Sequence, residues 1–380
     1  MQKEVTMSSL FEPVRIKNME IRNRFVRSAT YDGCPDRAGH VSEKQMRIFK
    51  ELADGGVGLI VTGLAYVLSS GKISQSQNSI ADDGCVPGLE KLTDAVHDRG
   101  ARIAVQLHHA GREAMKMPED KDEDAAVAPS FVPNDPYFEK SYRTITEDEI
   151  RTIIRAFGDA AERARKAGFD AVQLHGAHAY LLSQFLSPHT NRRDDDWGGT
   201  LENRLRFHHE IYRDIRAKVG EDYPVLIKLG VEDGFPGGLE FEEGMKAAEI
   251  LAQRGFDALE ISQGLRGKQY EGTEFRTKIN SVDREGYFRD WCKRVKSQVS
   301  VPVMMVGGLR TFELMEEVIQ EGEADFISLC RPLIREPGIV NEWKGGQRQR
   351  AKCISCNLCL SALREGETLH CAQQRSQARS

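Results

Sequence analysis

Eight short apolar segments recur along this chain of 380 residues, and stretches with a helical pattern separate them. The segments are rich in residues that favour β-strands, and glycine bounds many of them, as is typical of buried strands. They are FVRSAT (25–30), VGLIVTG (57–63), RIAVQLHH (102–109), AVQLHGA (171–177), VLIKLGV (225–231), ALEISQG (258–264), VPVMMVGG (301–308) and FISLCRP (326–332). Such regular alternation predicts parallel strands joined by helices.

The repeated unit favours a closed (β/α)8 TIM barrel over an open doubly wound α/β sheet. The segments KAGFDAVQLHG and QRGFDALEISQG share one junction, in which Gly168 and Gly255 end a helix just before a strand. Runs such as VPVMMV are apolar throughout, as expected for strands covered on both faces. No Gly-x-Gly-x-x-Gly pattern marks a separate dinucleotide-binding domain. We therefore predict one barrel over residues 1–345 and a cysteine-rich tail over 346–380.

Two segments depart from the repeat. Residues 10–24 alternate like a β-hairpin ahead of the first strand, and we expect them to plug the N-terminal mouth of the barrel. Residues 111–145 are rich in proline and acids and end at Thr146 and Glu149, which have the spacing of a capping box. We interpret 111–145 as a long loop over the active-site face after the third strand. The alternative is a mobile surface insertion.

Charge and hydropathy exclude several classes of protein. The chain has 53 basic and 58 acidic residues, a net charge of −5, and its basic residues form no stripe that would follow a nucleic-acid backbone. No apolar run approaches the roughly 18 residues of a membrane span. The N-terminal residues do not resemble a secretory signal. We expect a soluble cytoplasmic protein with no nucleic-acid partner and no membrane partner, and a homo-oligomer remains open.

Polar residues stand at the C-terminal ends of the predicted strands, where TIM barrels place their active sites. They are Thr30, Gly63, Gln106, His175, His178, Lys228, Gly307, Gly308 and Arg331. Loops near the seventh and eighth strands commonly bind phosphate in this fold. A phosphorylated cofactor lying across the mouth of the barrel fits this set.

Five motifs resemble the Old Yellow Enzyme family of FMN-dependent NADH:flavin oxidoreductases. They are NRFVRSAT, VQLHHAGR, HGAHAYLLSQFLSPHTNRRDDDWGGTLENR, VGGL and ISLCRPLIREP. The similarity extends from about residue 10 to the last cysteine, and the long motif from His175 to Arg204 is its most specific part. The resemblance implies an FMN-binding TIM barrel with NAD(P)H as co-substrate.

Carried over by position, the resemblance implies a flavin site with two ends. Its cofactor-binding residues would be Ser28, Ala29, Thr30, Gly63, Gln106, Lys228, Gly307, Gly308, Cys330 and Arg331. Thr30 would lie near the N5 edge, Gln106 near the pyrimidine edge and Lys228 near N1 and O2, where reduced flavin carries negative charge. The four last-named residues of the set would cradle the phosphate. Lys228 departs from the arginine that is commoner in the family, and Cys330 stands where many relatives have glycine.

The same resemblance gives catalytic roles to three residues. His175 and His178 would donate hydrogen bonds to a carbonyl oxygen, so that hydride adds to the β-carbon of an enone, and Tyr180 would protonate the α-carbon. Alone, a His-x-x-His pair is more often two ordinary polar histidines or part of a helical metal site. Here the pair follows a strand and has no third ligand nearby in sequence, which favours the catalytic interpretation.

Four of the eight cysteines, Cys353, Cys356, Cys359 and Cys371, crowd the tail. Their spacing resembles the [4Fe–4S] ligand run of the dienoyl-CoA reductase and trimethylamine dehydrogenase relatives, and we expect such a cluster. Zinc and free thiols are the alternatives. An electron-transfer protein or the flavin itself would supply electrons to the cluster.

The leading hypothesis is NAD(P)H-dependent reduction of an unsaturated carbonyl substrate. Thr30 stands where amine dehydrogenases of the trimethylamine type attach FMN through cysteine, so the flavin would be bound noncovalently. A second hypothesis is a dehydrogenase that oxidises an amine or carbonyl compound and passes electrons through the cluster to a partner. Outside redox chemistry, Lys228 permits a Schiff-base aldolase, and the cysteines permit a zinc-stabilised binding protein.

Overall fold

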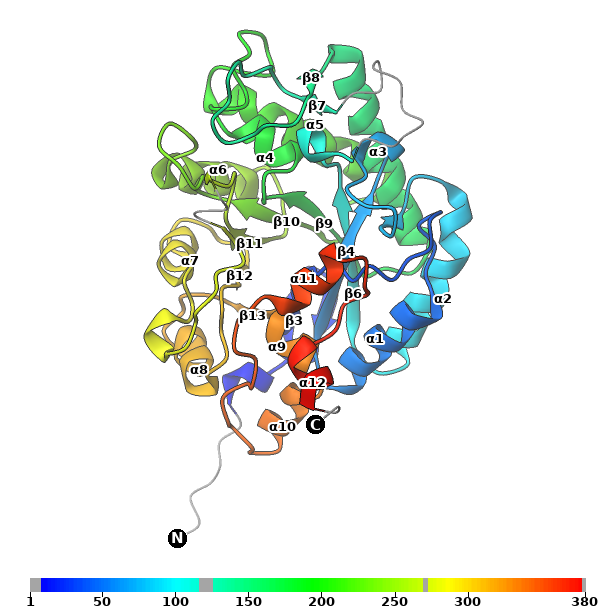
Figure 1. The fold of residues 1–380 in the computed structure, drawn as a ribbon, viewed down its shortest axis with the longest axis vertical. Helices are drawn as coiled ribbons and strands as arrows, with labels where there is room; N and C mark the ends of the chain where they lie inside the picture. The colour runs from blue at the N-terminus through cyan, green and yellow to red at the C-terminus, as the bar shows by residue number, and fades with distance from the viewer. Residues whose placement is uncertain (1–7, 116–125, 269–272, 378–380) are drawn as a thin grey trace.

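The computed structural model describes residues 8–115, 126–268 and 273–377, and it forms a closed barrel of parallel strands (Figure 1). The strands pair in the order β3, β13, β12, β11, β10, β9, β6, β4, and pairing of β3 with β4 closes the ring. These strands are β3 (Phe25–Arg27), β4 (Leu59–Tyr66), β6 (Arg102–His108), β9 (Ala171–Gly176), β10 (Val225–Gly230), β11 (Ala258–Ser262), β12 (Val303–Met305) and β13 (Phe326–Leu329). Each apolar segment of the sequence supplies one strand, and the predicted TIM barrel is confirmed.

Helices surround the strands and extend into the tail (Figure 1). They are α1 (Glu43–Asp54), α2 (Val86–His97), α3 (Glu147–Lys166), α4 (Leu181–Leu186), α5 (Leu201–Val219), α6 (Phe241–Gln253), α7 (Arg289–Lys296), α8 (Phe312–Gln320), α9 (Arg331–Arg335), α10 (Ile339–Lys344), α11 (Leu358–Arg364) and α12 (Ala372–Gln377). The predicted capping box is formed, because Thr146 and Glu149 bond each other's backbone N–H at the start of α3. Gly168 and Gly255 have φ values of +82° and +109°, a backbone conformation that favours glycine. None of the helices in the described part of the chain has the length and hydropathy to span a bilayer.

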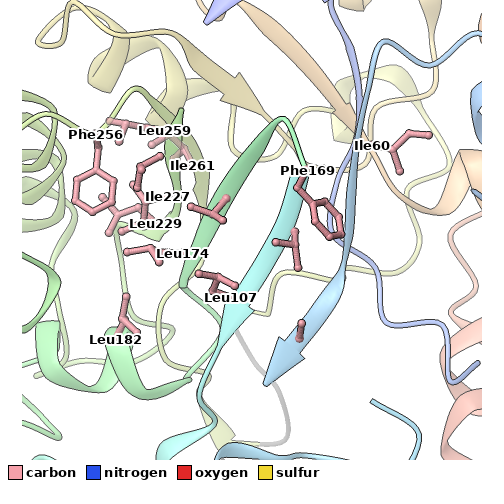
Figure 2. Packing of buried hydrophobic residues seen from close by; sticks show 14 of the residues in the cluster. Ile60, Leu107, Phe169, Leu174, Leu182, Ile227, Leu229, Phe256, Leu259 and Ile261 are labelled. Carbon is pink, nitrogen blue, oxygen red and sulfur yellow. The ribbon is translucent and has the colours of Figure 1, made fainter. Parts of the chain in front are cut away.

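Apolar side chains fill the space between the barrel strands and the surrounding helices. Figure 2 shows Leu107, Leu174, Ile227 and other strand residues among these side chains, and all three are completely buried. Full burial of such a side chain contributes about 1.5–3 kcal/mol. This outer layer fixes the strands and thereby the positions of the side chains that point into the barrel.

The N-terminal hairpin consists of β1 (Val14–Ile16) and β2 (Met19–Ile21), which pair antiparallel. Ile16, Met19 and Ile21 are buried in one cluster with inward side chains of the barrel strands. This cluster includes Val26, Val61, Ala104, Ala171, Leu226, Ala258, Met304 and Phe326. The cluster fills the N-terminal end of the barrel, so within the described part of the chain the opposite end is the one open to a ligand.

The described parts of the predicted loop 111–145 are held against the barrel, while its residues 116–125 lie outside the described residues. Two short strands, β7 (Val127–Ala128) and β8 (Arg143–Thr144), pair within it. Arg112 forms a buried ion pair with Asp135, with 2.7 Å between Nη1 and Oδ2. The ring of Tyr137 stacks on Phe235 with centroids 3.8 Å apart. The described part of the loop is therefore packed and not a free surface insertion.

Residues of the C-terminal tail return to the mouth of the barrel. The backbone N–H of Ala351 donates to the carbonyl of Arg310, and that of Leu369 donates to the carbonyl of Asp32. The side chain of Asn357 donates to the carbonyl of Phe275 over 2.7 Å. Figure 1 shows α11 in front of the barrel strands. The tail is thus bonded to loops on three sides of the mouth.

Candidate active site

The inner surface of the barrel changes from apolar to polar within two residues along six of the eight strands. Side chains two positions apart on a strand point the same way. The residues two positions beyond the apolar plug are Ser28, Gly63, Gln106, Gln173, Lys228, Glu260, Val306 and Ser328. A mostly polar layer therefore lies directly above the plug and forms the floor of the site.

A cavity of about 230 Å³ opens above this floor. Its wall contains all of the predicted catalytic and cofactor-binding residues except Gly63 and Gly307. Gly63 lies behind the wall, where a Cβ atom would approach the Thr30 carbonyl oxygen to 2.9 Å. At Gly308, which does line the cavity, a Cβ would lie 2.9 Å from the Tyr287 ring. Both glycines leave room that a larger residue would occupy.

Lys228 lies in a buried network that the sequence analysis did not anticipate. Its Nζ donates to Ser28 Oγ over 2.8 Å and lies 3.3 Å from Glu260 Oε1. Gln173 donates to the other Glu260 oxygen over 3.0 Å and accepts from Gln106 over 2.8 Å. Burial alone would raise the pKa of Glu260, but the Lys228 ammonium and the hydrogen bonds from Ser28 and Gln173 together outweigh this effect and hold that pKa below its usual value.

Because Glu260 is 1% exposed and paired with Lys228, the two groups together carry little net charge. The resemblance implied a fixed cation, Lys228, near N1 and O2 of the flavin, and its carboxylate partner Glu260 was not predicted. The ion pair holds the ammonium in one position beside this carboxylate. A signal for Glu260 was present in the sequence, since a charged residue within a buried strand requires a partner.

His175, His178 and Tyr180 form an aromatic cluster on one side of the cavity. The ring centroids of the two histidines are 5.0 Å apart, and those of His175 and Tyr180 are 4.8 Å apart. Burial lowers the pKa of His178 to about 3 and places that of His175 well below its usual value. Burial also raises the pKa of Tyr180 to about 12. All three side chains are therefore neutral near pH 7, and each has a single hydrogen to donate.

The two histidines have different surroundings. His178 Nε2 lies 2.8 Å from Ser262 Oγ, and its Nδ1 lies 3.6 Å from Glu274 Oε1. His175 Nδ1 is buried and has no hydrogen-bond partner among the described residues. The backbone of His178 has a φ of +60° and donates to the carbonyl of Gln263 over 3.0 Å, which fixes the loop after β9 to the loop after β11.

Glu274 and Arg266 are further charged groups beside this cluster. Arg266 donates to both carboxylate oxygens of Glu274, over 3.1 and 2.6 Å. Although burial acts in the opposite direction, this guanidinium and His178 keep the pKa of Glu274 far below its usual value. Both residues follow β11 in a part of the sequence without a periodic pattern, so their positions could not be predicted. Glu274 is the negative charge that faces His178.

The opposite side of the cavity is formed by the loop after β12, by the residues after β13 and by the tail. Arg331 Nη1 donates to the Arg276 carbonyl over 2.7 Å and to Asn357 Oδ1 over 2.6 Å. Thr30 Oγ1 lies 3.1 Å from Cys330 Sγ. The tail adds further lining residues, which are Ser355, Asn357, Cys359, Leu360, Leu363 and Leu369. We had not expected the tail to contribute a wall of the active site.

The four tail cysteines surround a second, smaller cavity of about 20 Å³. Arg331, Asn357 and Cys359 line both cavities, so the cysteine site adjoins the main one. Within the described ranges, no group of three or more histidine, cysteine or acidic side chains is arranged to hold a metal ion. The four thiols thus line one common cavity.

Comparisons with known proteins agree with this architecture. The sequence model of the NADH:flavin oxidoreductase / NADH oxidase family matches residues 9–350. An NADH oxidase of Thermoanaerobacter brockii is 38% identical over 356 residues, which are 92% of this chain and 53% of the relative. A cinnamate reductase of Clostridium sporogenes is 33% identical over 96% of this chain and 57% of its own length. The chain spans little more than half of these relatives.

A solved structure of 2-naphthoyl-CoA reductase in complex with 2-naphthoyl-CoA superposes with a TM-score of 0.87 and 28% identity, covering 96% of this chain and 56% of that one. The family match covers the whole barrel, from the hairpin to the residues after α10. The residues predicted at the strand ends line one cavity, except Gly63 and Gly307. The chain therefore belongs to the NADH:flavin oxidoreductase / NADH oxidase family.

Proposed function

We propose that this chain binds FMN noncovalently in the main cavity and uses NAD(P)H to reduce an activated C=C bond of an unsaturated carbonyl compound. The observation that carries the proposal is the shared cavity of His175, Tyr180, Lys228 and Thr30. It combines neutral hydrogen-bond donors on one side with a fixed ammonium at the floor. Membership of a flavin oxidoreductase family supports the redox character of the site.

The residues present fit a flavin mononucleotide. Lys228 and Gln106 would bind the polar edge of the ring system, and Thr30 would lie beside it. Arg331 and the glycine at 308 would receive the phosphate, because a guanidinium pairs well with a dianion and glycine permits close backbone approach. When bound, FMN supplies the hydride acceptor for the nicotinamide and the hydride donor for the substrate. Thr30 has no thiol for covalent attachment.

His175 is the better placed of the two histidines to bind the substrate oxygen. Its buried Nδ1 has no partner among the described residues, whereas both ring nitrogens of His178 face Ser262 or Glu274. We infer that His178 joins the substrate oxygen only when its contact with Ser262 or Glu274 is exchanged. Tyr180 would deliver the proton, since its hydroxyl stays protonated throughout the neutral range.

We also propose that the tail cysteines hold a [4Fe–4S] cluster. In a cubane each thiolate binds a different iron, so the four sulfurs stand farther apart than the four ligands of one zinc ion. The four thiols line a common cavity, and their spacing along the sequence resembles a [4Fe–4S] ligand run, which supports the cluster. A cluster beside the main cavity favours a second candidate function, in which a dehydrogenase passes electrons to a partner protein.

Three measurements test these proposals on the purified full chain. A visible flavin spectrum that stays in the supernatant after acid precipitation supports noncovalent FMN, and flavin that precipitates with the polypeptide contradicts it. Reduction by NADH or NADPH alone, followed by oxidation with an enone, supports ene reduction, whereas reduction by an amine alone supports the dehydrogenase. Iron and acid-labile sulfide in equal amounts support the cluster. A colourless protein would refute the redox proposal and restore the aldolase alternative at Lys228.

A further inference from the structure

Arg310 is a buried arginine at the end of the cavity that the catalytic residues do not occupy. It follows β12, whereas His175 lies on β9, and β10 and β11 separate these strands in the barrel. Its side chain is 5% exposed and belongs to the cavity wall. One arm of the guanidinium, Nη1, donates to the backbone carbonyl of Cys353 in the tail.

The rest of this guanidinium lacks partners. Nε and Nη2 of Arg310 are buried and make no hydrogen bond to any described residue. The nearest carboxylate oxygen is Glu285 Oε1, 3.9 Å from Nε, which is beyond hydrogen-bond distance. Glu285 already accepts from the N–H groups of residues 310 and 311, and Arg350 Nη2 lies 2.7 Å from it. Leaving two buried donors of a cation without hydrogen bonds costs free energy. This arrangement therefore favours binding of an anion at Arg310.

Other charges around Arg310 point the same way. Burial lowers the pKa of Arg310, and the nearby Arg350 and Arg331 guanidiniums lower it further, against the opposing effect of Glu285. Arg310 and Arg331 therefore repel each other across the wall that they share. An anion bound between them would relieve that repulsion and satisfy the free donors. A phosphate dianion has both the charge and the number of acceptors.

We propose that Arg310 binds the phosphate of the flavin nucleotide through its free arm while its other arm holds the Cys353 carbonyl. This inference rests on the proposed function, because it takes FMN as the occupant of the cavity. One rigid guanidinium would then join the cofactor to the cysteine segment. Phosphate binding and docking of the tail must favour each other, because linkage between two binding events is reciprocal.

The test compares FMN with riboflavin, which lacks the phosphate. Flavin-free full-length protein is titrated with each flavin, and binding is followed by quenching of flavin fluorescence. In Arg310→Gln we expect the dissociation constant of FMN to rise about tenfold to a hundredfold, as for loss of a charge-assisted hydrogen bond. Riboflavin affinity should stay near that of the wild type. Arg310→Lys, which keeps the charge without the fork, should give a smaller loss of FMN affinity.

Arg350→Gln is the matched control, because it removes a second arginine from Glu285 and lies outside the described cavity wall. It should leave the preference for FMN over riboflavin unchanged. Equal losses for both flavins in Arg310→Gln, or an unchanged FMN constant, would overturn the inference. Failure of the wild type to bind either flavin would instead refute the proposed function.

Hydrogen–deuterium exchange of the flavin-free protein tests the link to the tail. FMN, but not riboflavin, should slow exchange of the amides around Cys353 in the wild type, and this difference should disappear in Arg310→Gln. Protection by both flavins alike, or by neither, would contradict coupling through the phosphate.

Discussion

Replacing Tyr180 by Phe removes one hydroxyl from the cavity and leaves the ring that packs against His175 and His108. If Tyr180 delivers the proton to the substrate, the variant should still be reduced by NAD(P)H, because that half-reaction needs no proton from this side chain. Oxidation of the reduced flavoprotein by an enone should slow by about 10²–10⁴-fold, the usual contribution of a general acid.

The structure favours the upper part of that range. With a pKa of about 3, His178 is protonated in roughly one molecule in 10⁴ at pH 7, so it is a poor substitute acid. His175 is also a poor substitute acid, because its pKa is well below the usual value. In the wild type, the enone rate should not fall through loss of the Tyr180 proton until the pH approaches about 12.

Stopped-flow absorbance at the flavin band measures the two half-reactions separately. Tyr31→Phe is a suitable control, since Tyr31 also lines the cavity but its hydroxyl is bonded to Ser74 over 2.6 Å. The control should retain a near wild-type enone rate. Equal slowing of both half-reactions in Tyr180→Phe, or an unchanged enone rate, would refute the role of proton donor.

Three further predictions concern the tail, the floor and the loop. Cys356→Ser should lower bound iron and sulfide in anaerobically purified protein, and an unchanged iron content would exclude this thiol as a ligand. In flavin-free protein, Lys228→Met should lower the free energy of unfolding by about 3–5 kcal/mol because it strands Glu260. Burial then raises the pKa of that carboxyl, so urea titrations should show a smaller loss at pH 5 than at pH 8, and Lys228→Met combined with Glu260→Gln should restore stability. Arg112→Met should cost less, about 1–3 kcal/mol, because Asp135 loses its ion pair but keeps its contact with His189 and the hydrogen bond from the Tyr137 N–H, and unchanged protease sensitivity of the loop would contradict this.

The sequence predicted the positions of those residues that follow from the hydrophobic periodicity of the strands. The strands were recognisable because burial on both faces requires continuous apolar runs, and polar residues at their ends then had to meet at one mouth. His175 and Lys228 were found in this way, and the structure places both at the cavity. The same alternation could have identified Gln173 and Glu260, which lie two residues beyond the plug, but neither residue was predicted.

The remaining part of the site depends on contacts between distant irregular segments. Glu274 and Arg266 lie after β11, in a part of the sequence that has no hydrophobic periodicity. Their ion pair becomes visible only in the three-dimensional structure. Arg310 looked like an ordinary loop arginine, because nothing local shows that the Cys353 carbonyl will meet it. Leu363 and Leu369 are likewise apolar residues in a short tail, and only its return to the barrel makes them part of the wall.

Helix α11 combines two kinds of residue, since Cys359 faces the cysteine site while Leu360 and Leu363 face the main cavity. Directed evolution for bulkier substrates at these leucines would therefore also shift a thiol, and selection for a wider pocket would weaken the proposed cluster as a by-product. Phe275 lines the same cavity from the segment after β11 and belongs to no cysteine segment. A library built there would change the shape of the pocket while leaving the helix that carries the thiol untouched.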